Sequence, residues 1–473
     1  MVDEPYDVVI VGSGPGGYVA AIRAGQLGLR SALVEKDPFQ GGTCLHRGCI
    51  PTKALLENAA RYQELLHAGE FGLEVGEVRV DWERVQQRKR GIVRQLAAGV
   101  AGLLKKHGVE VVTGWGRLAG PRRVEVFGGS PGASGSEGPP LRTLAAEHIV
   151  IATGSIPREI PSLPCDGERI LHSDHVLELS AVPESLVVVG AGAVGVEFAS
   201  VYHSFGSRVV LVEALPRILP IEDDEVSVEL AKSFSKSGID VRTSTSLEGA
   251  EVHAAGVRVR LSGDDSGEVD AERLLIAIGR SPVSDGIGLD TTRAEPRCGY
   301  IVVDEYCETA EPGVFAIGDV NPTPWLAHVA SMEGVMVVER IAGREIHPVP
   351  YDETPNCTYC EPEVASVGLT ERAAREAGHE VRVGRFPFLA SGRAKIIGHT
   401  EGFVKIVADA KYDEVLGVHI IGARATELIA EAGAVLRLEG TVEELVHTIH
   451  AHPTLSESVH EAAHAVYEHA LHF

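Results

Sequence analysis

Short apolar runs that end at a glycine recur along the chain. Residues 6–11 (YDVVIV) form the first, and residues 31–34 form a second apolar run shortly after it. The same order returns at residues 186–189 and 209–212. Runs of this length, bounded by turn residues, are typical of strands buried in a parallel sheet between helices. The pattern therefore predicts two doubly wound α/β units.

Each unit opens with a glycine-rich turn. Residues 12–17 (GSGPGG) follow the first strand, and residues 190–195 (GAGAVG) follow its counterpart. Glu35 and Glu213 end the second run of the respective repeats, at the same spacing from the first glycine. A single glycine-rich turn of this kind is weak evidence for dinucleotide binding, since glycines also close ordinary turns. With a strand before it, a helix-compatible stretch after it and an acid at the ribose position, each repeat predicts a dinucleotide-binding site.

The glycines let a pyrophosphate approach the backbone at a helix N-terminus, where free N–H groups and the helix dipole favour an anion. The acid accepts a hydrogen bond from a ribose 2′-hydroxyl. In the second repeat Glu213 favours NAD, because a carboxylate would repel the 2′-phosphate of NADP.

Three further strand-then-glycine segments, at 148–154, 274–280 and 314–319, fit the same architecture. Their order around the two turns predicts that one nucleotide-binding domain is inserted into the other. After Tyr351, strand patterns with alternating apolar and polar residues, such as 403–407, give way to helical stretches such as 426–439, which predicts an α+β domain. The predicted domains are an FAD-binding domain at 1–154 that returns at 282–350, an NAD-binding domain at 155–281, and a dimerisation domain at 351–473.

Composition narrows the class of protein. The 473 residues are 44% hydrophobic and 23% charged, as in ordinary globular proteins, and the formal net charge is −24. Such a charge disfavours nucleic acid and anionic membranes as partners. Neither a signal segment nor an uninterrupted apolar run of membrane-spanning length is present, so we expect a cytoplasmic protein.

Residues 128–140 are rich in Gly, Ser and Pro and predict a flexible loop.

Two cysteines, Cys44 and Cys49, lie just downstream of the first glycine turn. The C-x4-C spacing is not a usual zinc pattern, and a thiol at a helix N-terminus gains reactivity because its thiolate is stabilised. The two alternatives are a redox-active pair and a pair of buried, unreactive thiols.

Cys357 and Cys360 form a second, C-x-x-C pair, which we interpret as structural thiols rather than a second redox centre.

The segment 41–53 (GGTCLHRGCIPTK) resembles the redox-active disulfide segment of the pyridine nucleotide-disulfide oxidoreductases, and among them most closely that of the dihydrolipoyl dehydrogenases. The resemblance extends over essentially the whole chain, through 315–320 (FAIGDV), 362–371 (PEVASVGLTE) and 450–457 (HAHPTLSE). It implies oxidation of protein-bound dihydrolipoamide to lipoamide, with FAD as cofactor and NAD reduced to NADH. It also implies a homodimer whose active site is shared between subunits.

The resemblance assigns roles to individual residues. Cys49 is expected against the flavin, while Cys44 exchanges with the substrate sulfur. Lys53 is expected beside the flavin, paired with Glu197. His452, held by Glu457, is implied as the base that reaches the cysteines of the other subunit.

Further residues are expected at the cofactors by the same resemblance, and only the turn glycines and the two ribose acids have an independent physical argument. For FAD they are Gly12, Gly14, Gly17, Glu35, Lys36, Thr43, Lys53, Gly116, Thr153, Gly154, Ser155, Asp319, Ala327 and His328, and for NAD they are Gly190, Gly192, Gly195, Glu197, Glu213 and Gly279.

The segment His460-Glu461-Ala462-Ala463-His464 matches the H-E-x-x-H pattern of zinc proteases. It lies within the C-terminal helix that the resemblance predicts and has no identifiable third ligand, so we expect no metal site.

Other enzymes of the family are weaker alternatives. Glutathione reductases prefer NADPH, mercuric reductases add C-terminal cysteines, and soluble transhydrogenases lack the paired thiols. A flavoprotein scaffold without turnover is an alternative of another class.

His46 and Arg47 depart from the neutral residues common between the two cysteines, so they would either stabilise a thiolate or change which lipoyl carrier is accepted. That carrier is expected to belong to a 2-oxoacid dehydrogenase complex or to a glycine-cleavage system.

Overall fold

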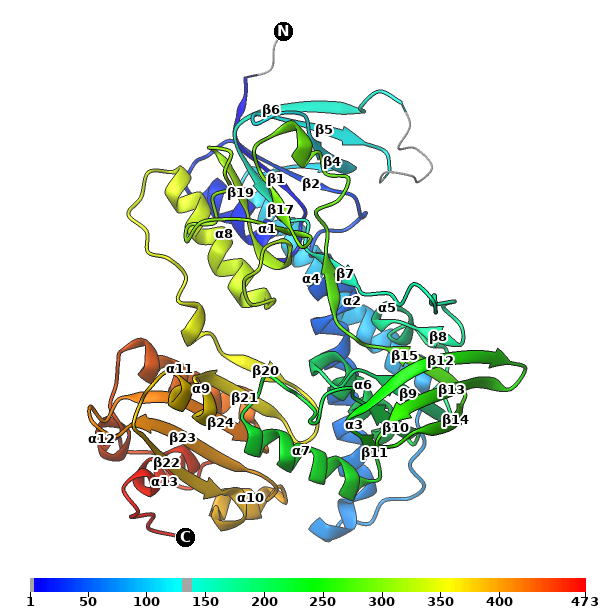
Figure 1. Ribbon diagram of the computed structural model, residues 1–473, viewed down its shortest axis with the longest axis vertical. Helices are drawn as coiled ribbons and strands as arrows, with labels where there is room; N and C mark the ends of the chain where they lie inside the picture. The colour runs from blue at the N-terminus through cyan, green and yellow to red at the C-terminus, as the bar shows by residue number, and fades with distance from the viewer. Residues whose placement is uncertain (1–3, 130–137) are drawn as a thin grey trace. The chain divides into compact units, whose positions relative to one another are not determined.

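The computed structural model describes residues 4–129 and 138–473. They form two compact units (Figure 1), of which one holds Met1–Ala54, Gln86–Arg158 and Arg280–Tyr351 and the other holds Leu55–Val85, Glu159–Gly279 and Asp352–Phe473. Among these described residues, no helix is long and apolar enough to cross a membrane. The segment predicted as a loop at 128–140 falls mostly outside them.

The first unit is built on a seven-stranded sheet with parallel pairing at its centre. Its helices pack on one face, where Val8 and Ile10 meet buried residues of α1, α4 and α8. On the other face Val9 and Val11 pack with β4, β5 and residues near Ile301. The elements are β1 (Tyr6–Val11), α1 (Pro15–Gln26), β2 (Ser31–Glu35), α4 (Trp82–Lys106), β3 (Glu110–Thr113), β4 (Trp115–Leu118), β5 (Arg123–Phe127), β6 (Arg142–Ile151), β19 (Val314–Ala316) and α8 (Ala327–Ile341).

Two short strands mark where the chain leaves this unit and returns. β7 (Ser155–Pro157) and β16 (Arg280–Pro282) pair antiparallel, with Ser155 opposite Pro282. The side chain of Thr153 donates to the carbonyl oxygen of Val283, and Val283 N–H donates to Gly154 O at 2.9 Å. These bonds tie the outgoing and incoming strands together over a sequence separation of more than a hundred residues.

The second unit contains another parallel sheet, in the order β11-β10-β9-β15-β8. Its strand β9 (Ser185–Val189) is buried throughout, as the apolar run at 186–189 predicts. An antiparallel three-stranded sheet packs beside it. The elements are β8 (Ile170–Leu171), β9 (Ser185–Val189), α6 (Ala193–Ser204), β10 (Arg208–Val212), α7 (Asp224–Ser237), β11 (Asp240–Arg242), β12 (Thr245–His253), β13 (Gly256–Gly263), β14 (Gly267–Ala271) and β15 (Arg273–Ile276).

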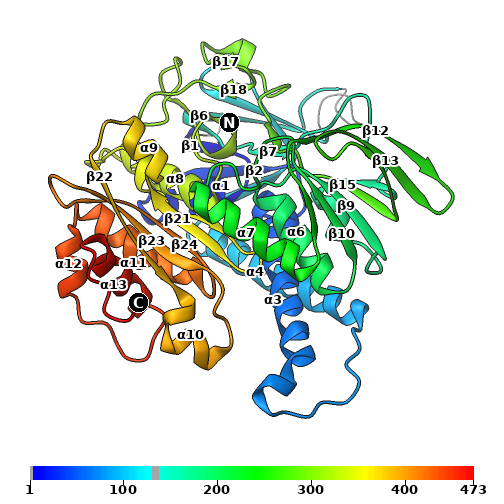
Figure 2. The ribbon, with the colours of Figure 1, turned by 60° about the horizontal axis from the view of Figure 1, so that its bottom comes forward.

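The C-terminal part of this unit is a five-stranded antiparallel sheet carrying helices (Figure 2). The predicted strand at 403–407 is present, but its predicted alternation is wrong, because every residue of β23 is buried. Val404 and Ile406 face a core shared with α11 and α13, while Phe403 faces the core shared with α7. The elements are β20 (Asn356–Thr358), β21 (Val364–Gly368), α9 (Glu371–Glu376), β22 (Val381–Pro387), α10 (Gly392–Ile397), β23 (Phe403–Asp409), β24 (Val415–Ile421), α11 (Ala425–Arg437), α12 (Val442–His447) and α13 (Glu457–Val466).

Candidate functional site

The first glycine turn has the geometry that a dinucleotide needs. Gly12 has φ +102°, and an added Cβ would lie 2.2 Å from the carbonyl oxygen of Ala152. An added Cβ on Gly17 would lie 1.9 Å from Gly12 O, so strand and helix touch here. At Gly14 an added Cβ would meet no atom of the described residues within 4 Å, and Gly14 begins α1 without a capping side chain among them. The turn is thus closed toward the sheet and open toward a ligand, as phosphate binding requires.

The second turn repeats these relationships residue by residue. Gly190 has φ +100°, and an added Cβ would lie 2.4 Å from Ala277 O. An added Cβ on Gly195 would lie 1.8 Å from Gly190 O, whereas around Gly192 the described residues leave the space open. Two segments that share three glycines thus fold to one turn, because the same close approaches exclude a side chain at the first and third of them.

The two ribose acids also occupy equivalent positions. Glu35 accepts hydrogen bonds from the N–H groups of Ser13 at 2.9 Å and Asp37 at 2.8 Å. Glu213 accepts from the N–H groups of Ala191 at 2.7 Å and Leu215 at 2.9 Å. Each carboxylate is therefore held at the edge of its turn by backbone donors on both sides.

Cys44 and Cys49 come together on two consecutive helices of the first unit, α2 (Gly42–Arg47) and α3 (Cys49–Leu66). Both are free thiols joined by a side-chain hydrogen bond. This bond and burial raise the pKa of the Cys44 thiol, while the positive charge of Lys53 lowers it, and the net shift is upward. The upward shift disfavours the Cys44 thiolate in the reduced pair.

The thiol segment lies directly on the first glycine turn. Gly41 N–H donates to Ser13 O at 2.9 Å, and an added Cβ on Gly42 would lie 2.6 Å from the Cα of Gly14. At position 42 the segment can approach the turn this closely only with glycine. The predicted proximity of the redox pair to the first dinucleotide site is thus a property of the fold.

The two cationic residues between the cysteines interact with the preceding loop. His46 Nε2 lies 2.9 Å from Gln40 O, and Arg47 donates to a carboxylate oxygen of Asp37 at 2.5 Å. Lys53, in contrast, is a source of positive charge at Cys44. Both side chains have partners in that loop, and their effect on the thiols or on the choice of lipoyl carrier stays a prediction.

A chain of three polar side chains crosses the point where the chain leaves and re-enters the first unit. Ser155 Oγ donates to Asp319 Oδ2 at 2.6 Å and accepts from Arg280 Nε at 2.7 Å. A second nitrogen of Arg280 donates to Ser155 O at 2.7 Å. Sequence reasoning predicted Ser155 and Asp319 but missed Arg280, whose position directly after Gly279 at the end of a strand was the available signal.

A second missed residue is Glu333 on α8, which is fully buried. It accepts hydrogen bonds from Gly318 N–H at 2.6 Å and from the hydroxyl of Tyr351 at 2.8 Å. Burial raises the pKa of the Glu333 carboxyl, although these donors oppose the shift. Glu333 therefore fixes the backbone of the turn that carries Asp319. Its signal in the sequence was weak, because a glutamate in a helix is usually a solvent-exposed residue.

His452 and Glu457 lie together in the second unit. His452 Nδ1 lies 2.8 Å from Glu457 Oε1, and Thr454 N–H donates to Glu457 Oε2 at 2.7 Å. Burial opposes ionisation of Glu457, but these two hydrogen bonds outweigh it and lower the pKa of the carboxyl. The carboxylate thus orients an imidazole whose side chain is 81% exposed.

The other predicted residues fall in several settings. Lys53 lies on α3 in the first unit, while Glu197 lies on α6 in the second and accepts from Tyr359 N–H at 3.0 Å. Lys36 pairs with Asp37 at the surface. The remaining ones are Thr43 on α2, Gly116 on β4 against Val11 and Val34, Thr153 and Gly154 at the start of β7, Ala327 and His328 at the start of α8, and Gly279 at the end of the second unit's inserted segment.

The second cysteine pair divides between two cores. Cys357 packs with the core between the C-terminal sheet and α11, whereas Cys360 is buried in the core that includes α6 and donates to Pro362 O. This arrangement agrees with structural thiols. His460 and His464 of the H-E-x-x-H pattern lie on α13, where His460 Nε2 contacts Val446 O at 3.1 Å.

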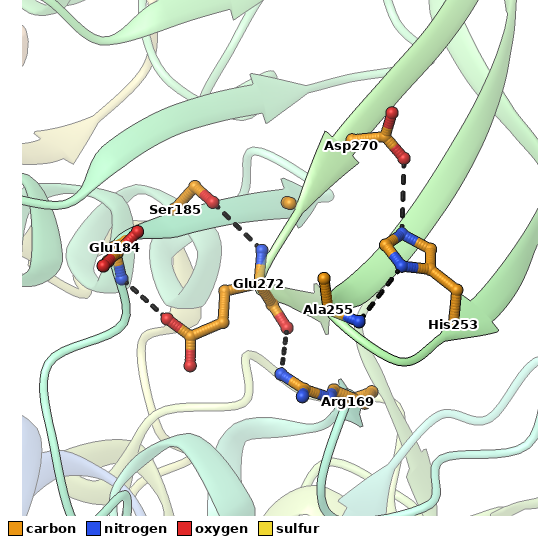
Figure 3. Close-up of a pocket in the computed structure, with 8 residues that line it drawn as sticks. Arg169, Glu184, Ser185, His253, Ala255, Asp270 and Glu272 are labelled. Atoms are coloured by element: carbon orange, nitrogen blue, oxygen red, sulfur yellow. Dashed lines mark hydrogen bonds and ion pairs between the residues drawn. The ribbon is translucent and has the colours of Figure 1, made fainter.

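A pocket of about 510 Å³ lies in the second unit among β9, β12 and β14 (Figure 3). Its polar groups bond with one another: His253 lies 3.4 Å from Asp270, and Ser185 Oγ accepts from Glu272 N–H at 3.0 Å. The side chain of Arg169 donates to Glu272 O at 3.2 Å. The residues that line it include none of the predicted site residues.

Comparison with known families settles the class of protein. A family model described as pyridine nucleotide-disulphide oxidoreductase matches residues 6–334, and a model described as the dimerisation domain of these enzymes matches residues 354–463. The chain belongs to the pyridine nucleotide-disulphide oxidoreductase family.

Curated members of this family are similar over nearly the whole chain. The dihydrolipoyl dehydrogenase of Bacillus subtilis is 45% identical over 471 residues, which cover 99% of both chains. That of Chlorobaculum tepidum is 46% identical and covers 97% of this chain and 96% of the relative. A leghemoglobin reductase of Glycine max is 41% identical, with 98% and 88% covered.

Solved structures of the family have the same fold. LpdA from Mycobacterium tuberculosis superposes with a TM-score of 0.88 at 28% identity, covering 96% of this chain and 98% of the other. The flavoprotein disulfide reductase RclA from Escherichia coli, as its Cu(II) complex, has a TM-score of 0.85 at 27% identity, with 97% and 99% covered.

Family membership confirms the predicted α/β fold class, the predicted class of flavoprotein oxidoreductase and its two cofactors, FAD and NAD. The dimerisation-domain match supports the predicted homodimer. The predicted domain boundaries and the roles of individual residues stay predictions.

Proposed function

We propose that this chain oxidises protein-bound dihydrolipoyl groups through Cys44 and Cys49 and passes the electrons by way of FAD to NAD. The curated dihydrolipoyl dehydrogenases, similar over nearly the whole chain, confirm the activity predicted from the sequence. The observation that carries the residue assignment is the hydrogen-bonded thiol pair held against the first dinucleotide turn.

The proposed thiol exchange has two steps. In the oxidised enzyme a substrate thiolate attacks Cys44 of the Cys44–Cys49 disulfide, which forms a mixed disulfide and releases Cys49 as a thiolate. The second substrate thiol then displaces Cys44, so that the substrate leaves as its cyclic disulfide and the enzyme is left as the dithiol. Two electrons move from the substrate to the cysteines, and each substrate thiol loses one proton.

The partner's His452 is proposed to accept the proton of the first substrate thiol, and the proton of the second goes to the Cys44 sulfur as that sulfur leaves. A histidine exchanges protons near neutral pH, and the Glu457 carboxylate both orients the ring and stabilises its cationic form. The exposure of His452 in the single chain suits a group that acts at the cysteines of the other subunit.

The residues present fit the two cofactors. The open glycine turns and the two carboxylates match the pyrophosphate and ribose of one dinucleotide each. Bound FAD and NAD supply the hydride chemistry that removes the electrons from the cysteines. In this assignment Glu213 would select NAD, and Asp319, one oxygen of which is held by Ser155, would bind the flavin cofactor with the other.

The proposed protein substrate is a lipoyl-bearing carrier of a 2-oxoacid dehydrogenase complex or of a glycine-cleavage system, and the proposed location is the cytoplasm. Another disulfide substrate is the alternative, because one relative bears the name leghemoglobin reductase and the solved RclA is described only as a disulfide reductase. A flavoprotein scaffold without turnover is disfavoured because all the chemical positions are occupied.

The deciding experiment is an anaerobic titration of the purified holoenzyme with NADH, followed by turnover assays with dihydrolipoamide and NAD or NADP. We expect an absorbance band at wavelengths beyond the flavin band, as a Cys49 thiolate in contact with the flavin would give, and turnover that depends on NAD. A band without dihydrolipoamide turnover would indicate another disulfide substrate. Neither band nor turnover would indicate the scaffold.

A further inference from the structure

His450, two residues before His452, is almost fully buried, with 6% of its side chain exposed. We propose that His450 is a positioning residue, which as an imidazolium ties the Thr448–His452 loop to α11 and thereby holds His452 in place for proton transfer. This inference rests on the role proposed above for His452.

The hydrogen bonds of His450 determine its protonation. Nε2 lies 2.6 Å from Oε1 of Glu431 on α11, and Nδ1 lies 3.0 Å from the carbonyl oxygen of Thr448. A carbonyl oxygen and a carboxylate only accept, so both ring nitrogens satisfy them only when each carries a hydrogen. The cationic ring therefore fits this place, and its charge is balanced by Glu431.

The loop has few other means of holding its shape. Ile449 is 97% exposed and the His452 side chain is 81% exposed, so little apolar surface is buried here. Thr448 and Thr454 bond within their own segments, to Glu444 O and Ala451 O. The His450–Glu431 pair instead joins the centre of the loop to a helix that packs on the C-terminal sheet.

Two further histidines lie near His450. The ring of His460 lies 5.1 Å away, and its Nε2 contacts Val446 O. His464 follows at 4.6 Å from His460. Burial and the neighbouring His460 lower the pKa of His464, with His447 and His469 acting in the same sense and Glu461 against it. Glu431 is the carboxylate bonded to His450.

The test compares two reactions of the holoenzyme. Oxidation of dihydrolipoamide by NAD requires the base, whereas reduction of ferricyanide by NADH does not use the dithiol reaction. We expect His450→Gln to lower kcat for dihydrolipoamide about ten- to hundredfold, as small misplacements of a catalytic group do. KM and the ferricyanide rate should stay within twofold of the wild type. Glu431→Gln, which keeps an acceptor but removes the charge, should have a smaller effect of the same kind.

The matched control is His379→Gln. His379 lies 2.8 Å from Asp409 and so forms a histidine–carboxylate pair of the same kind, away from the loop. It should leave both reactions unchanged. An equal loss of dihydrolipoamide turnover in His379→Gln and His450→Gln would overturn the proposal.

A double-mutant cycle separates positioning from a general structural role. If His450 acts through His452, then His450→Gln adds less than twofold to the loss already caused by His452→Gln. Full additivity would overturn the inference while leaving the role of His452 intact. A His452→Gln variant with wild-type turnover would instead refute the proposed base, and the inference with it.

Discussion

Glu213 accepts a hydrogen bond from the backbone N–H of Ala191 at 2.7 Å, so the carboxylate at the end of β10 is bound to the glycine turn at the end of β9. Glu35 and Ser13 repeat this relationship in the first unit at 2.9 Å. A carboxylate fixed in this way is already in position for a ribose hydroxyl and loses little freedom when a dinucleotide binds.

The first prediction concerns nucleotide preference. Glu213→Ala should raise KM for NAD about ten- to hundredfold, the equivalent of one hydrogen bond to a charged group, and should reduce the preference for NAD over NADP. Steady-state assays with both nucleotides measure this. Glu229→Ala, which removes the partner of Lys232 on α7, is the control and should change neither value. An unchanged KM for NAD in the Glu213 variant would contradict the assignment.

The second prediction concerns the thiols. Cys44→Ser and Cys49→Ser should each lower dihydrolipoamide turnover by roughly three orders of magnitude or more, because the exchange needs both sulfurs. Flavin content should be retained, and so should the reduction of ferricyanide by NADH. The exposed Cys298 offers the control Cys298→Ser, which should behave as the wild type. Turnover that survives in Cys44→Ser would exclude the proposed exchange.

The third prediction concerns Arg280, the residue that sequence reasoning missed. Arg280→Met removes two hydrogen bonds to Ser155 and frees the serine hydroxyl from its fixed direction toward Asp319. FAD binding should weaken about tenfold or more, as expected for the loss of charge-assisted bonds. The measurement is the FAD affinity of the apoprotein, followed by flavin fluorescence, with Arg280→Lys expected to lie in between. Equal affinities in all three proteins would show that the bonds do not organise the site.

The fourth prediction concerns stability against acid. Lys405 is buried and lies 3.0 Å from Asp223 and 2.8 Å from Glu371. Burial raises the pKa of Asp223, but His419 and Lys405 outweigh it, and a hydrogen bond from Lys405 is the main cause that lowers the pKa of Glu371. Both folded-state pKa values lie below the unfolded ones, so the carboxylates stabilise the fold above about pH 4 and lose that contribution as the pH falls further.

Lys405→Met should accordingly cost about 3–5 kcal/mol of unfolding free energy at pH 7, since it leaves the buried Asp223 carboxylate without its cation. The difference from the wild type should shrink below about pH 4, where the carboxylates become protonated. Urea unfolding at several pH values measures it, and Lys232→Met, on an exposed pair, is the control. A difference that does not change with pH would mean that packing, not charge, sets the cost.

The fifth prediction concerns the second cysteine pair. Cys357→Ser and Cys360→Ala should leave dihydrolipoamide turnover within twofold of the wild type, because the two side chains belong to different cores. Cys360→Ala should lower stability by about 1 kcal/mol, as the loss of a small buried side chain does. A strong loss of turnover with retained stability would reveal a redox role instead.

The sequence alone determined the repeated dinucleotide turns, their acids and the nearness of the two cysteines. These are local features: a close approach of backbone to backbone admits only glycine, and strand lengths are set by short apolar runs. The resemblance then supplied His452 and Glu457, which lie a few residues apart. Their contact was predictable for the same local reason.

Only the tertiary structure decided which distant side chains meet. Arg280 follows Ser155 by 125 positions and Asp319 follows it by 164. Glu333 fixes the Asp319 turn through a backbone donor. The burial of β23 on both faces, which places Lys405 among carboxylates, depends on α7 and α11 packing on opposite sides. Hydrogen bonds and burial of this kind join groups by their position in space, and the spacing of residues along the chain does not record that position.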